Sequence, residues 1–279
     1  MRTRLSSAGL GIALPHPAVL TAAVAVVILF DLPSAFSTML GYSVLSDREF
    51  WLRDLPPLLA MPYALTNSYV LVLGIPISLC LRMAERLPLA FLPVMTCHGC
   101  SPHRVVRDLL REAVLHSLLF WLATTGIVAI AMHICCTGSY GPSYLDTLAQ
   151  AGADLSPLPH AALISLVLCA ETLIEALGLA LVVAGIRIIS ANGAAPIVAL
   201  LAMVLARDVV APLALTFAPA SLQESAMSII GLLEPDSYNE LSATLSHAAA
   251  FSLVCLTAGG ALAVACLCAP RACTKGGRW

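Results

Sequence analysis

Residues 160–190 read HAALISLVLCAETLIEALGLALVVAGIRIIS, and this stretch decides the class of fold. Its charged side chains are Glu171, Glu175 and Arg187, and nearly all the rest is apolar. An α-helix rises ~1.5 Å per residue, so the run is long enough to cross ~30 Å of hydrocarbon. The stretch therefore predicts a transmembrane helix.

The same pattern recurs along the chain. The six long apolar runs are residues 17–40, 57–81, 113–136, 160–190, 196–217 and 247–269. Hydrophobic residues make up 59% of the chain and charged residues 11%, far below the roughly 25% of soluble domains. We therefore expect an all-α polytopic membrane protein, one domain over residues 1–279 with six transmembrane helices. The first run could instead be a signal peptide cleaved near Ser37, but its length favours a retained helix.

The basic residues are sorted between the gaps that separate these runs. Eleven of the fourteen lysines and arginines lie in alternate gaps: Arg2, Arg4, Arg82, Arg86, Arg104, Arg107, Arg111, Arg187, Arg271, Lys275 and Arg278. Cytoplasmic loops carry an excess of Lys and Arg, so both termini are predicted to be cytoplasmic. The chain is expected to lie in lipid, and it has no stripe of basic residues of the kind that binds a nucleic acid.

The inner segment before the third run has the signature of a helix start. Ser101 suits the N-cap and Pro102 suits the first helical position. The apolar positions 105, 106, 109 and 110 share one helical face, and three arginines share another: Arg104, Arg107 and Arg111. We predict a short amphipathic helix at the inner membrane surface that leads directly into the third span.

This segment, His98-Gly99-Cys100-Ser101-Pro102-His103-Arg104, resembles the turn after span two in the membrane subunits of ABC-2-type ABC transporters. In that family the turn is commonly Arg-x-Gly-Ser-Arg with a following aromatic, and it opens the helix that contacts the ATPase. Gly99 and the basic character match, whereas the serine and the tryptophan are replaced or shifted. Six spans, cytoplasmic termini and a helical segment between spans five and six add to the resemblance.

The resemblance implies the permease subunit of an exporter in a bacterial plasma membrane, paired with a second identical or different permease subunit. It also implies coupling to a separate ATPase through the inner segment: His98, Gly99, Ser101, His103, Arg104, Arg107 and Arg111. The chain has no Gly-x-x-x-x-Gly-Lys-Ser/Thr phosphate loop, so ATP hydrolysis is expected from that partner. No enzymatic activity and no cofactor are expected of the chain itself.

Charged residues inside the membrane are expensive and mark pairing or function. A tight turn near residues 190–193 would make the fourth and fifth runs antiparallel, which puts Glu175 level with Arg207 and its neighbour Asp208. Glu171 lies one turn further out on the face of Glu175. These four residues either neutralise one another or line a polar path. The second interpretation allows a membrane-embedded enzyme or a proton-coupled secondary transporter that uses Glu171 and Glu175.

Potential metal ligands are few. Cys97 and Cys100 have the C-x-x-C spacing of zinc sites, but no second cysteine pair lies nearby, so we expect no metal site. His116, near the inner end of the third run, is expected to be an interfacial residue and not a ligand.

Overall fold

The computed structural model describes residues 11–33, 69–87, 101–135, 161–190 and 239–268, together with the single residues 195, 198, 201 and 202. Side chains are described for these residues except 31, 69, 135, 161–168 and 239–252. Every element in the described part is helical, which confirms the all-α prediction. The elements are α1 (Pro17–Val26), continued by a π-helical turn (Val27–Asp31), α4 (Tyr69–Arg86), α6 (Pro102–Cys135), α8 (Ala161–Ile189) and α12 (Asn239–Cys268).

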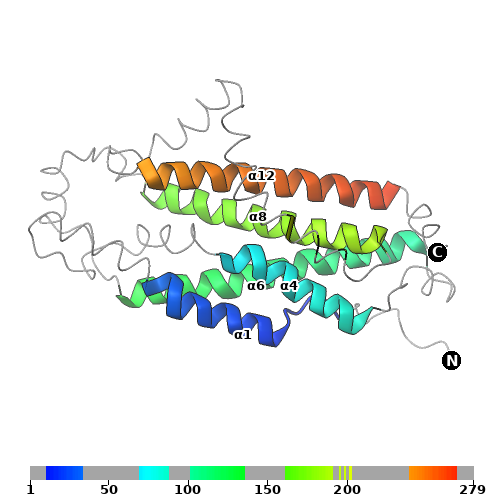
Figure 1. Cartoon of the computed structure of the whole chain (residues 1–279), viewed down its shortest axis with the longest axis horizontal. Helices are drawn as coiled ribbons and strands as arrows, with labels where there is room; N and C mark the ends of the chain where they lie inside the picture. Colours follow the sequence, from blue (N-terminus) through cyan, green and yellow to red (C-terminus); the bar gives the residue numbers. More distant parts are fainter. Residues whose placement is uncertain are drawn as a thin grey trace, which may run out of the picture.

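The long helices lie side by side in an elongated bundle (Figure 1). α6 begins at the end of the bundle where α4, α8 and α12 finish, and α1 also begins toward that end. We call it the basic end, because α6 starts there with Arg104, Arg107 and Arg111. α8 finishes at this end, and α12 starts at the opposite one. The predicted fifth run, 196–217, lies outside the described residues apart from three single positions.

The first turns of α6 form as the sequence predicts. The Val105 amide donates to the Ser101 carbonyl at 3.1 Å, which starts the helical ladder directly after Pro102. The four apolar side chains at 105, 106, 109 and 110 are buried, whereas the three arginines at 104, 107 and 111 are exposed. The amphipathic segment and the third run are one uninterrupted helix of 34 residues. The predicted amphipathic helical segment is confirmed, as the first turns of a longer helix; its position at the inner membrane surface stays a prediction.

α8 and α12 pack in parallel through glycines. A Cβ on Gly178 would lie 2.5 Å from the backbone carbon of Cys255, and a Cβ on Gly259 would lie 2.7 Å from the Gly178 carbonyl oxygen. Seven residues further along α8, a Cβ on Gly185 would lie 2.9 Å from the Cβ of Leu262 on α12. Small residues allow such close backbone approach between helices in membranes. α8 thus holds the centre of the bundle, with α12 on one side and α4 and α6 on the other (Figure 1).

Two of these helices are candidates for crossing a membrane. Pro102–Ile134 of α6 and Cys169–Ile189 of α8 are long and apolar enough, whereas the apolar stretches Pro17–Phe30 and Leu253–Cys268 are shorter. Large apolar side chains also point outward from the bundle, among them Leu29, Phe30, Leu122, Ile130, Ile134, Leu253, Val254 and Val264. Exposed apolar surface of this extent is typical of a protein that contacts lipid or another apolar surface.

Candidate functional site

The exposed start of α6 holds most of the predicted coupling residues. The side chains of Arg104 and Arg107 are 59% and 70% exposed, and their nearest carboxylate is that of Asp108, at 3.8 and 3.7 Å. Ion pairs this exposed contribute little to stability, so both guanidinium groups remain able to bind a partner. His98 and Gly99 lie outside the described residues.

The same surface includes the end of α12. An open depression at the basic end is lined by Ser101, His103, Arg104, Arg107 and Leu267. Leu267 comes from the last turn of α12, so two helices far apart in the sequence form this surface. The arginine side chains, with Leu267 beside them, would suit an acidic partner that also has some apolar surface.

A layer of polar side chains lies further along α6, where it faces α8. The Trp121 indole N–H donates to the Thr172 hydroxyl at 2.9 Å, and this hydroxyl donates to the Cys169 carbonyl at 3.0 Å. Thr124 bonds to carbonyls of its own helix, Phe120 at 3.0 Å and Trp121 at 3.1 Å. We call Trp121, Thr124 and Thr172 the polar layer.

The two predicted carboxylates flank this layer on successive turns of α8. Glu175 is buried and Glu171 is half-buried, and one oxygen of Glu171, Oε1, receives no hydrogen bond from the described part of the chain. Their predicted partners Arg207 and Asp208 lie outside the described residues, so the charge pair stays a prediction. A buried carboxyl group of this kind can accept a proton or a cation in a membrane protein.

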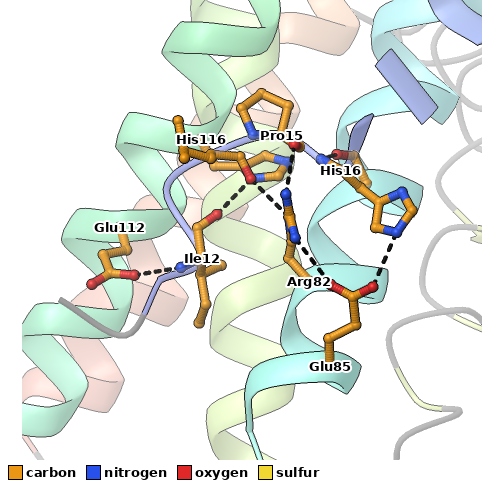
Figure 2. Close-up of polar contacts among 9 residues, drawn as sticks. Ile12, Pro15, His16, Arg82, Glu85, Glu112 and His116 are labelled. Atoms are coloured by element: carbon orange, nitrogen blue, oxygen red, sulfur yellow. Dashed lines mark hydrogen bonds and ion pairs between the residues drawn. The ribbon is translucent and has the colours of Figure 1, made fainter. Parts of the chain in front are cut away.

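A third site, a network of hydrogen bonds that the sequence did not predict, lies directly before α1. Residues 11–16, which we call the N-terminal strap, lie across α4 and α6 (Figure 2). On the α6 side, the Ile12 amide donates to Glu112 Oε2 at 2.8 Å, and His116 Nδ1 lies 2.8 Å from the Ile12 carbonyl oxygen. A carbonyl oxygen can only accept, so His116 carries its proton on Nδ1. The Ile12 side chain and His116 are both fully buried.

The α4 side holds the other half of the strap. Arg82 donates through Nε to the Leu14 carbonyl at 3.0 Å and through Nη2 to the Pro15 carbonyl at 3.2 Å. The His16 amide donates to the Ser78 hydroxyl at 2.8 Å. Figure 2 shows Arg82 between the strap and Glu85, with which it also pairs.

Glu85 completes this network at the surface, beyond the predicted second span. Its two carboxylate oxygens each lie 3.1 Å from a basic group, one from Arg82 Nη1 and the other from His16 Nε2. Desolvation acts against the charged carboxylate, but the hydrogen bonds from Arg82 and His16 outweigh it and lower the pKa of Glu85.

These contacts were beyond reach of the sequence because they join residues 62 to 104 positions apart. From the sequence, His116 was predicted to lie at the membrane interface. In the structure its side chain is completely buried and donates a hydrogen bond to the Ile12 carbonyl. The available signal was Arg82 with Glu85, an i,i+3 pair at the end of an apolar run. In the described part of the chain, no three His, Cys, Asp or Glu side chains come close enough to hold a metal ion.

Because no known protein matches the chain, its function is argued from the geometry described above. No known protein family, no curated protein and no solved structure matches the chain. The resemblance to ABC-2-type permeases, drawn from the residues around Gly99 and the number of apolar runs, stays a prediction.

Proposed function

We propose that the chain is the membrane-spanning permease subunit of an ATP-binding-cassette exporter, with six transmembrane helices and cytoplasmic termini in a bacterial plasma membrane. The observation that carries the proposal is the continuity of α6. At ~1.5 Å per residue its 34 residues span ~51 Å, roughly 20 Å more than the hydrocarbon core. The excess length includes the exposed arginines at the basic end.

Continuity lets α6 transmit a force. Arg104 lies seventeen residues, or ~26 Å along the axis, from Trp121. The intervening turns contain neither proline nor glycine, so the helix has no built-in hinge there. A partner ATPase that moves the arginine-bearing turns therefore moves Trp121 against Thr172 on α8. In this mechanism the ATPase supplies the energy, and two permease subunits form the pathway between them.

The direction of the helices also supports the proposal. α1, α4, α6 and α8 alternate in direction, and α8 and α12 run parallel (Figure 1). With one further crossing between α8 and α12, this pattern gives six spans and brings both termini to the basic end. Positive charge at that end corresponds to the cytoplasmic side.

The proposal is tested by reversing charge at the coupling surface. Full-length tagged protein is purified from the bacterium that encodes it, and vanadate-sensitive ATP hydrolysis is measured in the purified complex. We expect the double variant Arg104→Glu, Arg107→Glu to lose most of this activity, because an acidic partner would be repelled. The charge-preserving variant Arg104→Lys, Arg107→Lys is the matched control and should retain it. Absence of ATPase activity from the wild-type preparation, or its persistence in the charge-reversed one, would contradict the assignment.

A second function is favoured by Glu171, whose Oε1 is buried without a hydrogen bond from the described residues. A proton-coupled secondary transporter would use this carboxyl group together with Glu175, and a membrane-embedded enzyme would use both as acid and base or as metal ligands. Purified chain without an ATPase, reconstituted in vesicles that hold a pH-sensitive dye, separates the possibilities. Proton flux that Glu171→Gln abolishes supports the secondary transporter, and stoichiometric bound metal supports the enzyme. The exporter requires neither result.

A further inference from the structure

Most polar contacts of the N-terminal strap are made by its main chain, and its side chains add the buried Ile12 and the pair between His16 and Glu85. Five backbone groups of residues 12–16 bond to side chains of the bundle: the Ile12 amide and carbonyl, the Leu14 and Pro15 carbonyls, and the His16 amide. The binding side chains come from two helices, Ser78 and Arg82 from α4 and Glu112 and His116 from α6. A single short segment therefore connects the last turns of α4 to the turns of α6 that directly follow Arg111.

We propose that the strap is a releasable latch that holds α4 and α6 together near the basic end and so restricts the movement of α6. While the strap is seated, separating the two helices requires breaking either the bonds to α6 or the bonds to α4. The first are made by Glu112 and His116, and the second by Ser78, Arg82 and Glu85. The proposal concerns the chain alone, so it stands whether an ATPase or another partner acts on α6.

The composition of the strap suits release. Ile12 is fully buried, but Leu14 is 67% exposed, so the apolar anchor is essentially one side chain. Gly11 adopts a φ of +73°, a conformation that L-residues with side chains rarely take, and it turns the chain into the strap beside Arg86. Only the last residue of the strap takes part in a helix, since the His16 carbonyl accepts from the Leu20 amide at 2.9 Å at the start of α1, so residues 11–15 can leave without unwinding a helix.

Release would also change the surroundings of two buried polar side chains. Glu112 and His116 face the strap from within α6, and both bond to Ile12 (Figure 2). His116 Nε2 is buried and has no hydrogen-bond partner in the described part of the chain. When Ile12 leaves, water can reach this ring and the Glu112 carboxylate, which offsets part of the bonding lost.

The latch is tested by hydrogen–deuterium exchange of the full-length protein in lipid nanodiscs. His116→Phe keeps a ring of similar size but removes the donor to Ile12. We expect the amides of residues 11–14 and 16 to exchange roughly five- to tenfold faster, the factor for one lost hydrogen bond. The amides of residues 103–116 and of the end of α4 should exchange faster as well. The matched control is Ser117→Ala, since among the described residues the neighbouring Ser117 hydroxyl bonds only to the Val114 carbonyl of its own helix, at 2.9 Å. This control should exchange like the wild type.

A second variant, Ile12→Ala, keeps the test valid if His116→Phe does not fold. It weakens the apolar anchor of the strap and leaves the sequences of α4 and α6 unchanged. It should accelerate exchange at the same sites as His116→Phe. Faster exchange confined to the strap in both variants would show that the strap is merely attached, and would overturn the latch. Unchanged exchange in Ile12→Ala would overturn it equally. Neither result bears on ATPase activity, so failure of the latch and failure of the exporter assignment are distinguishable.

Discussion

Replacing Gly178 with alanine tests the close contact between α8 and α12. The added Cβ would lie 2.5 Å from the Cys255 backbone carbon and 2.6 Å from the Leu256 backbone nitrogen. Both obstacles are main-chain atoms, so no side-chain rotation relieves the clash. The helices must separate.

The size of the effect follows from the distances. Reaching the shortest ordinary contact of 3.4 Å requires the two backbones to move apart by about 0.9 Å at this point. A gap of ~0.5–1 Å forfeits a quarter to a half of the dispersion energy of each contact it opens. Overpacking costs ~1–3 kcal/mol, and backbone obstruction favours the upper end of that range. Alanine recovers about 1 kcal/mol of helix propensity, which leaves a net loss of about 2 kcal/mol.

The assay is equilibrium unfolding in dodecylmaltoside micelles titrated with SDS and followed by circular dichroism. Two glycines provide controls, because a Cβ at Gly126 on α6 or at Gly260 on α12 meets no atom within 4 Å. Gly260→Ala should be neutral or more stable by up to about 1 kcal/mol, from propensity alone. If Gly178→Ala proved as stable as Gly260→Ala, the parallel glycine contact between α8 and α12 would be refuted.

Two further predictions concern the polar layer and Glu85. Thr172→Val removes the acceptor of the Trp121 indole N–H and should cost about 1 kcal/mol in the same SDS titration, with a shift in tryptophan emission. The control is Thr257→Val, which should leave both readouts unchanged, because within the described part of the chain the exposed Thr257 hydroxyl bonds only to carbonyls of its own helix. Because folding lowers the pKa of Glu85 below its usual 4.5, its stabilisation is present above pH 4.5 and is lost as the pH falls through the lower folded value. Thermal melts on either side of this window should therefore differ less in Glu85→Gln than in the wild type, and an equal pH dependence of the two proteins would contradict the network around Arg82.

Periodicity and apolar length were sufficient to predict the helices and one part of the candidate site. The run 160–190 corresponds to α8 almost residue for residue, because an uninterrupted apolar stretch permits little else in a membrane. The face of α6 with its exposed arginines followed from 3.6-residue spacing. The apolar run near residue 247 covers only the later part of α12, since the first turns of this helix, from Asn239, are polar.

The sequence by itself determined the all-helical class, the apolar length of the elements and the basic face of α6, because these depend on composition and on spacing within one helix. Only the tertiary structure decided that Leu267 joins this face, that glycines bring α8 and α12 into contact, and that residues 11–16 bind across α4 and α6. The physical reason is that each of these contacts joins segments far apart in the chain. Hydrogen bonds such as those from Glu112 and His116 to Ile12 depend on distances between helices, and no local pattern encodes such distances.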